Sequence, residues 1–409
     1  MTRLFLSLCL VMLLISGCQT TEVMTVQESR TSPAGDTRHR MEEAIARRIL
    51  MDVQNDLPSL PVAEQSGYLR EKITLFEASV DLQMTSERVA FEKKLLDYLY
   101  LQSDLATFGS GYLPVLQKRT TLDWSLPEYR QVIEQELIRI DQTIAVLTES
   151  SPGSFDMPQY VEVRRKRASY PEDSFEGRQS YLDALADAML EAQLDWYDTL
   201  ENYEESELAI FGEQDQGENS MGQMFRFSPA GLTINLTNVR DLPDFETKAL
   251  AVYYGFPGMR SISVNSSESL KQFLRISAYQ HGWGAYMVDH IGNRDTKHTI
   301  DYLLYARMLA ALALADFNLH TGSWNRNQAK QQLHSTLPLS DHRIELMLNQ
   351  LELEPGHFVA TLAGKSEFTR MQEQCLDQGL GDVCHSVFHQ RIVDWGPIPF
   401  ALLEERLFQ

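Results

Sequence analysis

Four histidines in the last third of the chain are the first candidates for chemistry: His281, His290, His298 and His320. Imidazole nitrogens are common metal ligands, so a zinc site that includes His281 and His320 is one interpretation. His281 and His290 are nine residues apart, whereas two ligands on one helix face stand three or four residues apart. The spacing therefore favours histidines that pack and form hydrogen bonds.

Other catalytic patterns are missing from the sequence. No Gly-x-Ser-x-Gly elbow occurs, and Ser110 lies in a Gly-Ser-Gly-Tyr segment with no base assigned to it. The chain has neither a Walker-type phosphate loop nor a dinucleotide fingerprint. The acidic run at 201–207 lacks the alternating spacing and central glycine of a calcium loop, so it indicates a solvated helix face.

Aromatic residues gather in the same part of the chain as the histidines: Tyr253, Tyr254, Phe256, Trp283 and Tyr286. Aromatic side chains bury well, so core packing is the first interpretation. The lining of a groove is the alternative, because Tyr, Trp and Arg are the residue types that favour contacts with a peptide or protein partner.

The segments that must position these residues are mainly helical in pattern. Apolar residues recur at four-residue steps in 37–56, and similar patterns in 66–106 and 126–149 predict further helices. The long acidic stretch 175–212 predicts two more. The helical pattern returns from Phe245 to the end, with breaks at Pro257-Gly258, Gly292-Asn293, Pro338 and Pro355-Gly356.

Residues 225–238 differ from the rest, because polar residues alternate there with β-forming ones. They predict a short strand or hairpin. The fold class is therefore mainly α, with one large helical domain and a small β element. We expect an N-terminal helical region at 36–212 and a C-terminal region at 213–409, packed as one body.

Composition excludes some classes of partner. The 409 residues include 57 Asp and Glu against 36 Lys and Arg, which gives a net charge of −21. A nucleic acid needs a basic face, so no nucleic-acid partner is expected. Hydrophobic residues make up 43% and charged residues 23% of the chain, as in a packed globular protein.

The N-terminus has the pattern of a bacterial lipoprotein signal. Arg3 precedes an apolar run of 12 residues that ends before Ser16-Gly17-Cys18. Such a run suits a signal peptide and is short for a membrane-spanning helix. We expect cleavage after residue 17, acylation of Cys18, and a flexible tether over 18–35. Gln19 in place of Asp favours the outer membrane of a Gram-negative cell, with the body facing the periplasm.

Cysteine usage agrees with an oxidising compartment. Cys9 lies in the signal and Cys18 is the lipidation site, which leaves Cys375 and Cys384. A pair across a short glycine-containing loop predicts a disulfide. A metal site is the weaker interpretation, because no Cys-x-x-Cys pair accompanies them.

The chain from about 220 to the end resembles the bacterial family known as domain of unknown function 885. The segments that carry the resemblance are, in order, INLTN (234–238), YYGFPGMR (253–260), HGWGAYMV (281–288), DFNLHTGSW (316–324), NRNQA (325–329), PGHFVATLAG (355–364) and FHQRIVDWGPIPFALLEE (388–405). The family is grouped with the helical zincin metallopeptidases, and many of its members are lipoproteins. The resemblance thus implies a zincin-like body.

The same resemblance implies that the catalytic groups are lost. The family's first His and general-base Glu match Tyr253 and Tyr254, and its downstream His pair matches Met259 and Arg260. The Glu before its Gly-Trp matches His281. A permanent positive charge repels zinc, and a tyrosine with a pKa near 10 is a poor base near neutral pH.

The sequence therefore predicts a pseudo-enzyme with no catalytic residues, no bound metal and no cofactor. A binding or scaffolding role for a peptide or envelope protein is expected in a vestigial cleft formed by Tyr253, Tyr254, Met259, Arg260, His281, Trp283, Tyr286 and His320. One alternative is a zinc peptidase with altered ligands. The other is a purely structural envelope protein whose cleft is filled by its own side chains.

Overall fold

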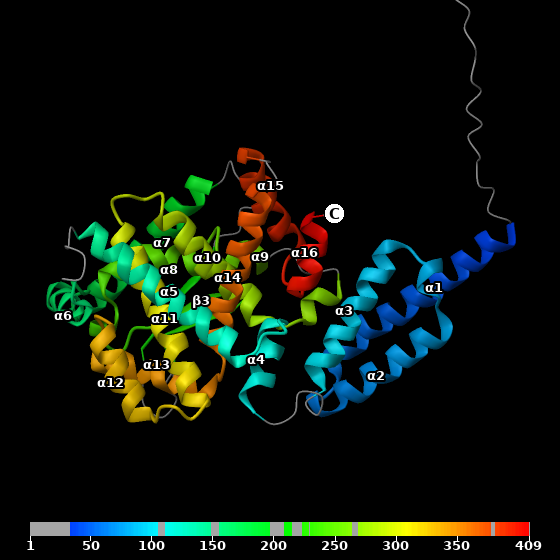
Figure 1. Ribbon diagram of the computed structural model, residues 1–409, viewed down its shortest axis with the longest axis horizontal. Helices are drawn as coiled ribbons and strands as arrows, with labels where there is room; N and C mark the ends of the chain where they lie inside the picture. Colours follow the sequence, from blue (N-terminus) through cyan, green and yellow to red (C-terminus); the bar gives the residue numbers. More distant parts are fainter. Residues whose placement is uncertain are drawn as a thin grey trace, which may run out of the picture.

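The chain folds into a mainly helical molecule with one small sheet, which confirms the predicted fold class (Figure 1). The computed structural model describes residues 33–104, 111–148, 155–196, 208–214, 223–228, 230–263, 269–377 and 381–408. The helices of the first half are α1 (Pro33–Asp56), α2 (Val62–Ser79), α3 (Glu87–Ser103), α4 (Tyr112–Thr120), α5 (Leu126–Leu147), α6 (Met157–Arg167) and α7 (Phe175–Trp196).

The second half continues the helical pattern. Its helices are α8 (Thr247–Tyr254), α9 (Met259–Ser263), α10 (Ser277–Gly292), α11 (Thr299–His320), α12 (Arg326–Thr336), α13 (Asp341–Leu353), α14 (His357–Cys375), α15 (Gly381–Trp395) and α16 (Phe400–Phe408). The breaks predicted at Pro257-Gly258, Gly292-Asn293, Pro338 and Pro355-Gly356 all separate helices in the structure. The helix ends predicted from proline and glycine are therefore confirmed.

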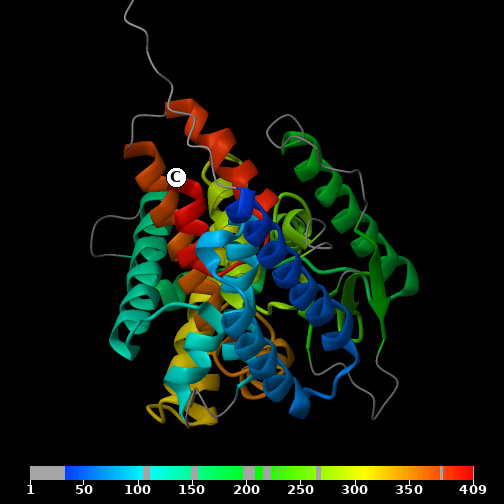
Figure 2. The same cartoon turned by 90° about the vertical axis from the view of Figure 1, so that its right-hand side faces the viewer.

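Helices α1, α2 and α3 form a three-helix unit at one side of the molecule (Figure 1), and Figure 2 views the molecule from that side. Helix α3 attaches the unit to the body. The Phe91 ring lies 5.3 Å from the Trp395 ring, and Lys94 Nζ lies 2.7 Å from Glu405 Oε2. Helix α1 begins at Pro33, inside the segment 18–35 that was predicted to be a tether. Proline is well suited to the first turn of a helix.

The sheet has three short strands, β1 (Ile210–Glu213), β2 (Phe225–Ser228) and β3 (Gly231–Asn235). Strand β3 is central, with β2 antiparallel on one side and β1 parallel on the other. The β2–β3 pair is the predicted hairpin. The helical prediction for the end of 175–212 is wrong, because Ile210 and its neighbours pair with β3 instead. The sheet thus joins residues on both sides of the expected boundary at 212.

Helices α10 and α14 make the most extensive contact between elements in the described part of the chain. A Cβ atom at Gly364 would lie 1.8 Å from the carbonyl oxygen of Ala278, and one at Gly282 would lie 2.6 Å from the Cα of Gly364. Only glycine allows two backbones to approach this closely. Helix α5 packs against α14 and α11, so these helices form the centre of the body.

The predicted cysteine pair lies at the α14–α15 junction, where the sulfur atoms of Cys375 and Cys384 are bonded to each other. The predicted signal peptide, Cys18 and most of the tether lie outside the described residues. Within them, no helix combines the length and the hydropathy that crossing a bilayer requires.

Candidate functional site

The last turn of α8 carries Tyr253 and Tyr254, the two residues at the expected centre of the site. The Tyr253 ring is buried, and its hydroxyl lies 3.0 Å from Nδ1 of His281 on α10. The rings of Tyr253 and Tyr254 meet edge to face at 4.8 Å. The structure therefore brings together three of the residues that the sequence predicted to be neighbours.

A residue that the sequence analysis did not place in the site completes this group. His357 is the first residue of α14, and its ring meets the ring of His281 edge to face at 4.3 Å. It follows Pro355-Gly356, so the sequence predicts its position at the start of a helix. The sequence gives no signal for its contact with His281 on α10. We call Tyr253, Tyr254, His281 and His357 the aromatic cluster.

The aromatic cluster is uncharged at neutral pH. Burial raises the pKa of Tyr253 well above its usual value, and burial lowers the pKa of His281 well below its usual value. Burial lowers the pKa of His357 to about 3, and the positive charge of Arg119 acts in the same direction. The cluster thus holds two neutral phenols and two neutral imidazoles. The carboxylate of Glu354 lies at its edge, with Oε2 3.8 Å from Nδ1 of His357.

The space beside the aromatic cluster is small. A cavity of about 40 Å³ lies against Tyr253, Tyr254, Tyr305, Arg343 and His357, together with apolar side chains. This volume holds at most a few water molecules. Of the residues that the sequence predicted to line a cleft, Tyr253 and Tyr254 border this cavity.

Trp283 and Tyr286 point to another side of α10, because their spacing from His281 differs from the period of a helix. The indole nitrogen of Trp283 donates to the carbonyl oxygen of Pro257 at 2.8 Å. The hydroxyl of Tyr286 lies 2.9 Å from Nε2 of the fully buried His389 on α15. These two residues belong to the packing between α10, α9 and α15.

The remaining predicted site residues are spread along two other elements. Met259 and Arg260 begin α9, and Met259 packs beside Gly284 of α10. His320 ends α11, where its Nδ1 lies 3.0 Å from Oδ1 of the buried Asp316 and its ring stacks on Tyr112. This hydrogen bond with Asp316 raises the pKa of His320.

Asp316 also fixes the start of α14. Its carboxylate accepts hydrogen bonds from the backbone amides of Gly356 and Phe358 at 2.9 and 3.2 Å. His320 is thus part of the connection between the end of α11 and the start of α14. In the described ranges, no group of three or more His, Cys, Asp or Glu residues lies in position to hold a metal ion.

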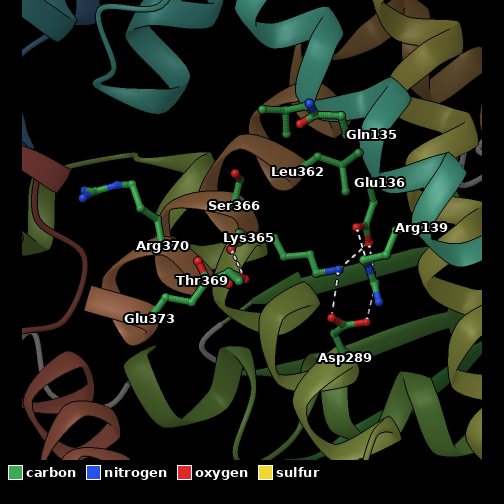
Figure 3. A pocket seen from close by; sticks show the side chains of 11 residues that line it. Gln135, Glu136, Arg139, Asp289, Leu362, Lys365, Ser366, Thr369, Arg370 and Glu373 are labelled. Atoms are coloured by element: carbon green, nitrogen blue, oxygen red, sulfur yellow. Dashed lines mark hydrogen bonds and ion pairs between the residues drawn. The ribbon is translucent and has the colours of Figure 1, made fainter. Parts of the chain in front are cut away.

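A second group of polar residues, which was not predicted, joins α5 to α10 and α14. Glu136 and Arg139 of α5 meet Asp289 of α10 and Lys365 of α14 beside a cavity of about 410 Å³ (Figure 3). We call these four residues the ion quartet. Arg139 Nε lies 2.8 Å from Glu136 Oε2, and Arg139 Nη2 lies 2.7 Å from Asp289 Oδ1.

Lys365 completes the ion quartet from the buried side. Its ammonium group contacts the Glu136 carboxylate and lies 3.3 Å from Asp289 Oδ2. Burial alone would raise the pKa of Glu136, but Lys365 and Arg139 outweigh it and lower that pKa to about 2. Two cations therefore balance two anions, and the side chains hold one another in place.

Comparison with known proteins gives a family and a fold. Residues 103–407 match the family model described as a bacterial protein of unknown function (DUF885). This match begins well before residue 220, so it also covers most of the helices that the sequence resemblance left out. No curated protein matches the chain.

Two solved structures are similar to this one. The first is described as a putative lipoprotein from Colwellia psychrerythraea, with a TM-score of 0.62 and 17% identity, over 85% of this chain and 67% of that chain. The second is described as a putative lipoprotein of unknown function from Shewanella oneidensis, with a TM-score of 0.54 and 12% identity, over 91% of this chain and 73% of that chain. At these identities the likeness shows the fold alone.

Proposed function

The chain belongs to the DUF885 family of bacterial proteins of unknown function, and we propose that it is a catalytically inactive, zincin-like lipoprotein of the cell envelope. The observation that carries this proposal is the aromatic cluster. Zinc catalysis needs neutral imidazoles with a carboxylate around an open coordination position, and a nearby base to activate water. Here two tyrosines occupy the positions of the family's first His and Glu.

The packing around the cluster supports the same conclusion. Two carboxylates near it have other partners: Asp316 binds the first turn of α14, and Glu246 faces Arg343 in the core at 3.4 Å. A third, Glu354, accepts a hydrogen bond from Gln350 and stands 3.8 Å from His357. A peptide could not enter the 40 Å³ cavity without displacing tyrosine side chains. The geometry therefore favours a cluster that stabilises the fold over a cleft that binds a peptide. A scaffolding role for an envelope partner would then use the outer surface.

The N-terminal sequence and the descriptions of the two similar structures support the proposed lipid anchor. The apolar run followed by Ser16-Gly17-Cys18 has the order of a lipoprotein signal. Both similar solved structures are described as lipoproteins with the qualification putative. Gln19 favours an outer-membrane location, with the body facing the periplasm. Several acyl chains on one cysteine give stable anchoring, whereas a single chain is marginal.

The test is the metal content of the full-length protein after dialysis, measured by elemental mass spectrometry, together with hydrolysis of a peptide library. We expect no stoichiometric transition metal and no hydrolysis that a chelator abolishes. Near-stoichiometric zinc would overturn the proposal if His281→Ala removed it. His334→Ala is the matched control, because His334 is half exposed and pairs with Asp341 away from the cluster.

A further inference from the structure

The outward side of α1 combines cations with exposed methionines. Arg40, Met41, Ala44, Arg47, Arg48 and Met51 are all exposed and recur at helical spacing, so they share one side of the helix. We call this set the α1 face. Met41 and Met51 are 58% and 52% exposed, which is high for large apolar side chains.

The charges of α1 are sorted between its two sides. Arg47 and Arg48 extend outward with 57% and 76% of their side chains exposed, and they pair with Glu43 and Asp52. The carboxylates of these pairs are only 15% and 30% exposed, because they turn toward α2 and α3. Glu43 accepts hydrogen bonds from Ser86, for example. The α1 face is thus cationic in a protein whose net charge is −21.

The number of residues between Cys18 and Pro33 limits how far α1 can lie from the proposed anchor. Pro33 follows Cys18 by 15 residues, and such a segment spans at most about 50 Å when fully extended. The α1–α3 unit stands at one side of the body (Figures 1 and 2). The distance from Cys18 therefore allows α1 to lie at the membrane surface.

We propose that the α1 face rests on the anionic phospholipid surface of the membrane that holds the Cys18 anchor. This inference depends on the anchor that the proposed function includes. Acidic headgroups complement Arg40, Arg47 and Arg48, and the two methionines enter the boundary between headgroups and acyl chains. The contact holds the α1–α3 unit against the membrane and points the acidic body away from a surface of like charge.

The experiment uses full-length protein purified with its lipid and inserted into vesicles of phosphatidylethanolamine with either phosphatidylglycerol or phosphatidylcholine. Hydroxyl-radical footprinting reports the accessibility of each side chain. We expect oxidation of Met41 and Met51 to fall about fivefold with phosphatidylglycerol, and to recover in about 0.5 M salt. Phe175 and Leu353, which are exposed on the body, should react equally in both kinds of vesicle.

Variants separate charge from general packing. The triple change Arg40→Gln, Arg47→Gln and Arg48→Gln should abolish the protection. The matched control Arg130→Gln, Arg226→Gln and Arg275→Gln removes three exposed cations from other elements and should retain it. Circular dichroism checks that both variants stay folded.

Three outcomes would count against the inference or its premise. Unprotected methionines in protein whose mass includes the acyl chains would overturn the α1 contact and leave the anchor intact. Equal protection in both kinds of vesicle, unchanged in the triple variant, would mean that a second copy of the chain covers the α1 face, and would also overturn it. A mass without acyl chains on Cys18 would overturn the proposed anchor.

Discussion

Helices α10 and α14 meet in two polar contacts of opposite character. His281 faces His357 in the aromatic cluster, and Asp289 pairs with Lys365 in the ion quartet. Eight residues separate the two members on each helix. One contact is neutral and lies beside a cavity of about 40 Å³, whereas the other is fully charged and borders a cavity of about 410 Å³.

The third element at each contact accounts for the difference. At the aromatic cluster, α8 contributes Tyr253, which satisfies His281 with a neutral hydroxyl. At the ion quartet, α5 contributes Glu136 and Arg139, whose opposite charges compensate those of Asp289 and Lys365. Burial disfavours charge in both places, but at the ion quartet Lys365 and Arg139 outweigh burial and lower the pKa of Glu136.

The largest effect is expected at the ion quartet. Lys365→Met leaves Glu136 and Asp289 close together with one cation between them, and should lower the free energy of unfolding by about 3–5 kcal/mol. Urea denaturation of the full chain measures this. The double variant Lys365→Met, Glu136→Met should recover most of the loss. A single variant within about 1 kcal/mol of the wild type would mean that water screens the quartet like a surface ion pair.

The two contacts should also lose their contributions to the free energy of unfolding in different pH ranges. His357 has a pKa of about 3 when folded against its usual 6.5, so the unfolded chain binds more protons between these values and stability falls as the pH drops below 6.5. At pH 5 this loss is about 2 kcal/mol. Glu136 has a pKa of about 2 against its usual 4.5, so the contribution of its charge is lost only below pH 4.5.

Unfolding free energies measured from pH 8 to pH 3 check this order. His357→Gln should reduce the slope in the upper range, where the buried His281 still contributes, and leave the lower range unchanged. Glu136→Gln should do the reverse. If both variants kept the wild-type slope between pH 6.5 and pH 4.5, neither group would be the source of the acid sensitivity.

The smallest effect is expected from the hydrogen bond within the aromatic cluster. Tyr253→Phe removes the hydroxyl that faces His281 and should lower the free energy of unfolding by about 1 kcal/mol, as for a typical buried hydrogen bond. The same urea titration measures it. An unchanged midpoint would show that the contact adds nothing to stability, and that ring packing alone holds the cluster.

Local signals predicted much of the fold. Proline and glycine marked the ends of the helices around the site, and alternation marked the β2–β3 hairpin. The order of motifs also placed Tyr253, Tyr254 and His281 in one region, where the structure finds them in contact. The helix ends and the hairpin are each encoded within a short stretch of chain, whereas the grouping of these three residues came from the order of motifs in the family resemblance.

Features that depend on distant partners could not be predicted in this way. Strand β1 has only four residues, and its pairing with β3 spans two stretches that look unrelated in the sequence. Glu136 and Lys365 belong to no motif. Charged residues in a segment with a helical pattern are expected on the solvent-exposed face, so their burial could not be predicted. His357 resembles an ordinary helix start until the packing of α14 on α10 brings His281 beside it.

The close approach of α10 and α14 at Gly364 has a consequence for how this protein can change. The two backbones are held by glycines and by apolar side chains. Side chains at 281 and 357 can therefore be exchanged while the backbones of α10 and α14 stay in register. These positions could therefore carry a designed metal site. Its ligands could be selected for their metal-binding chemistry without changing how the two helices pack.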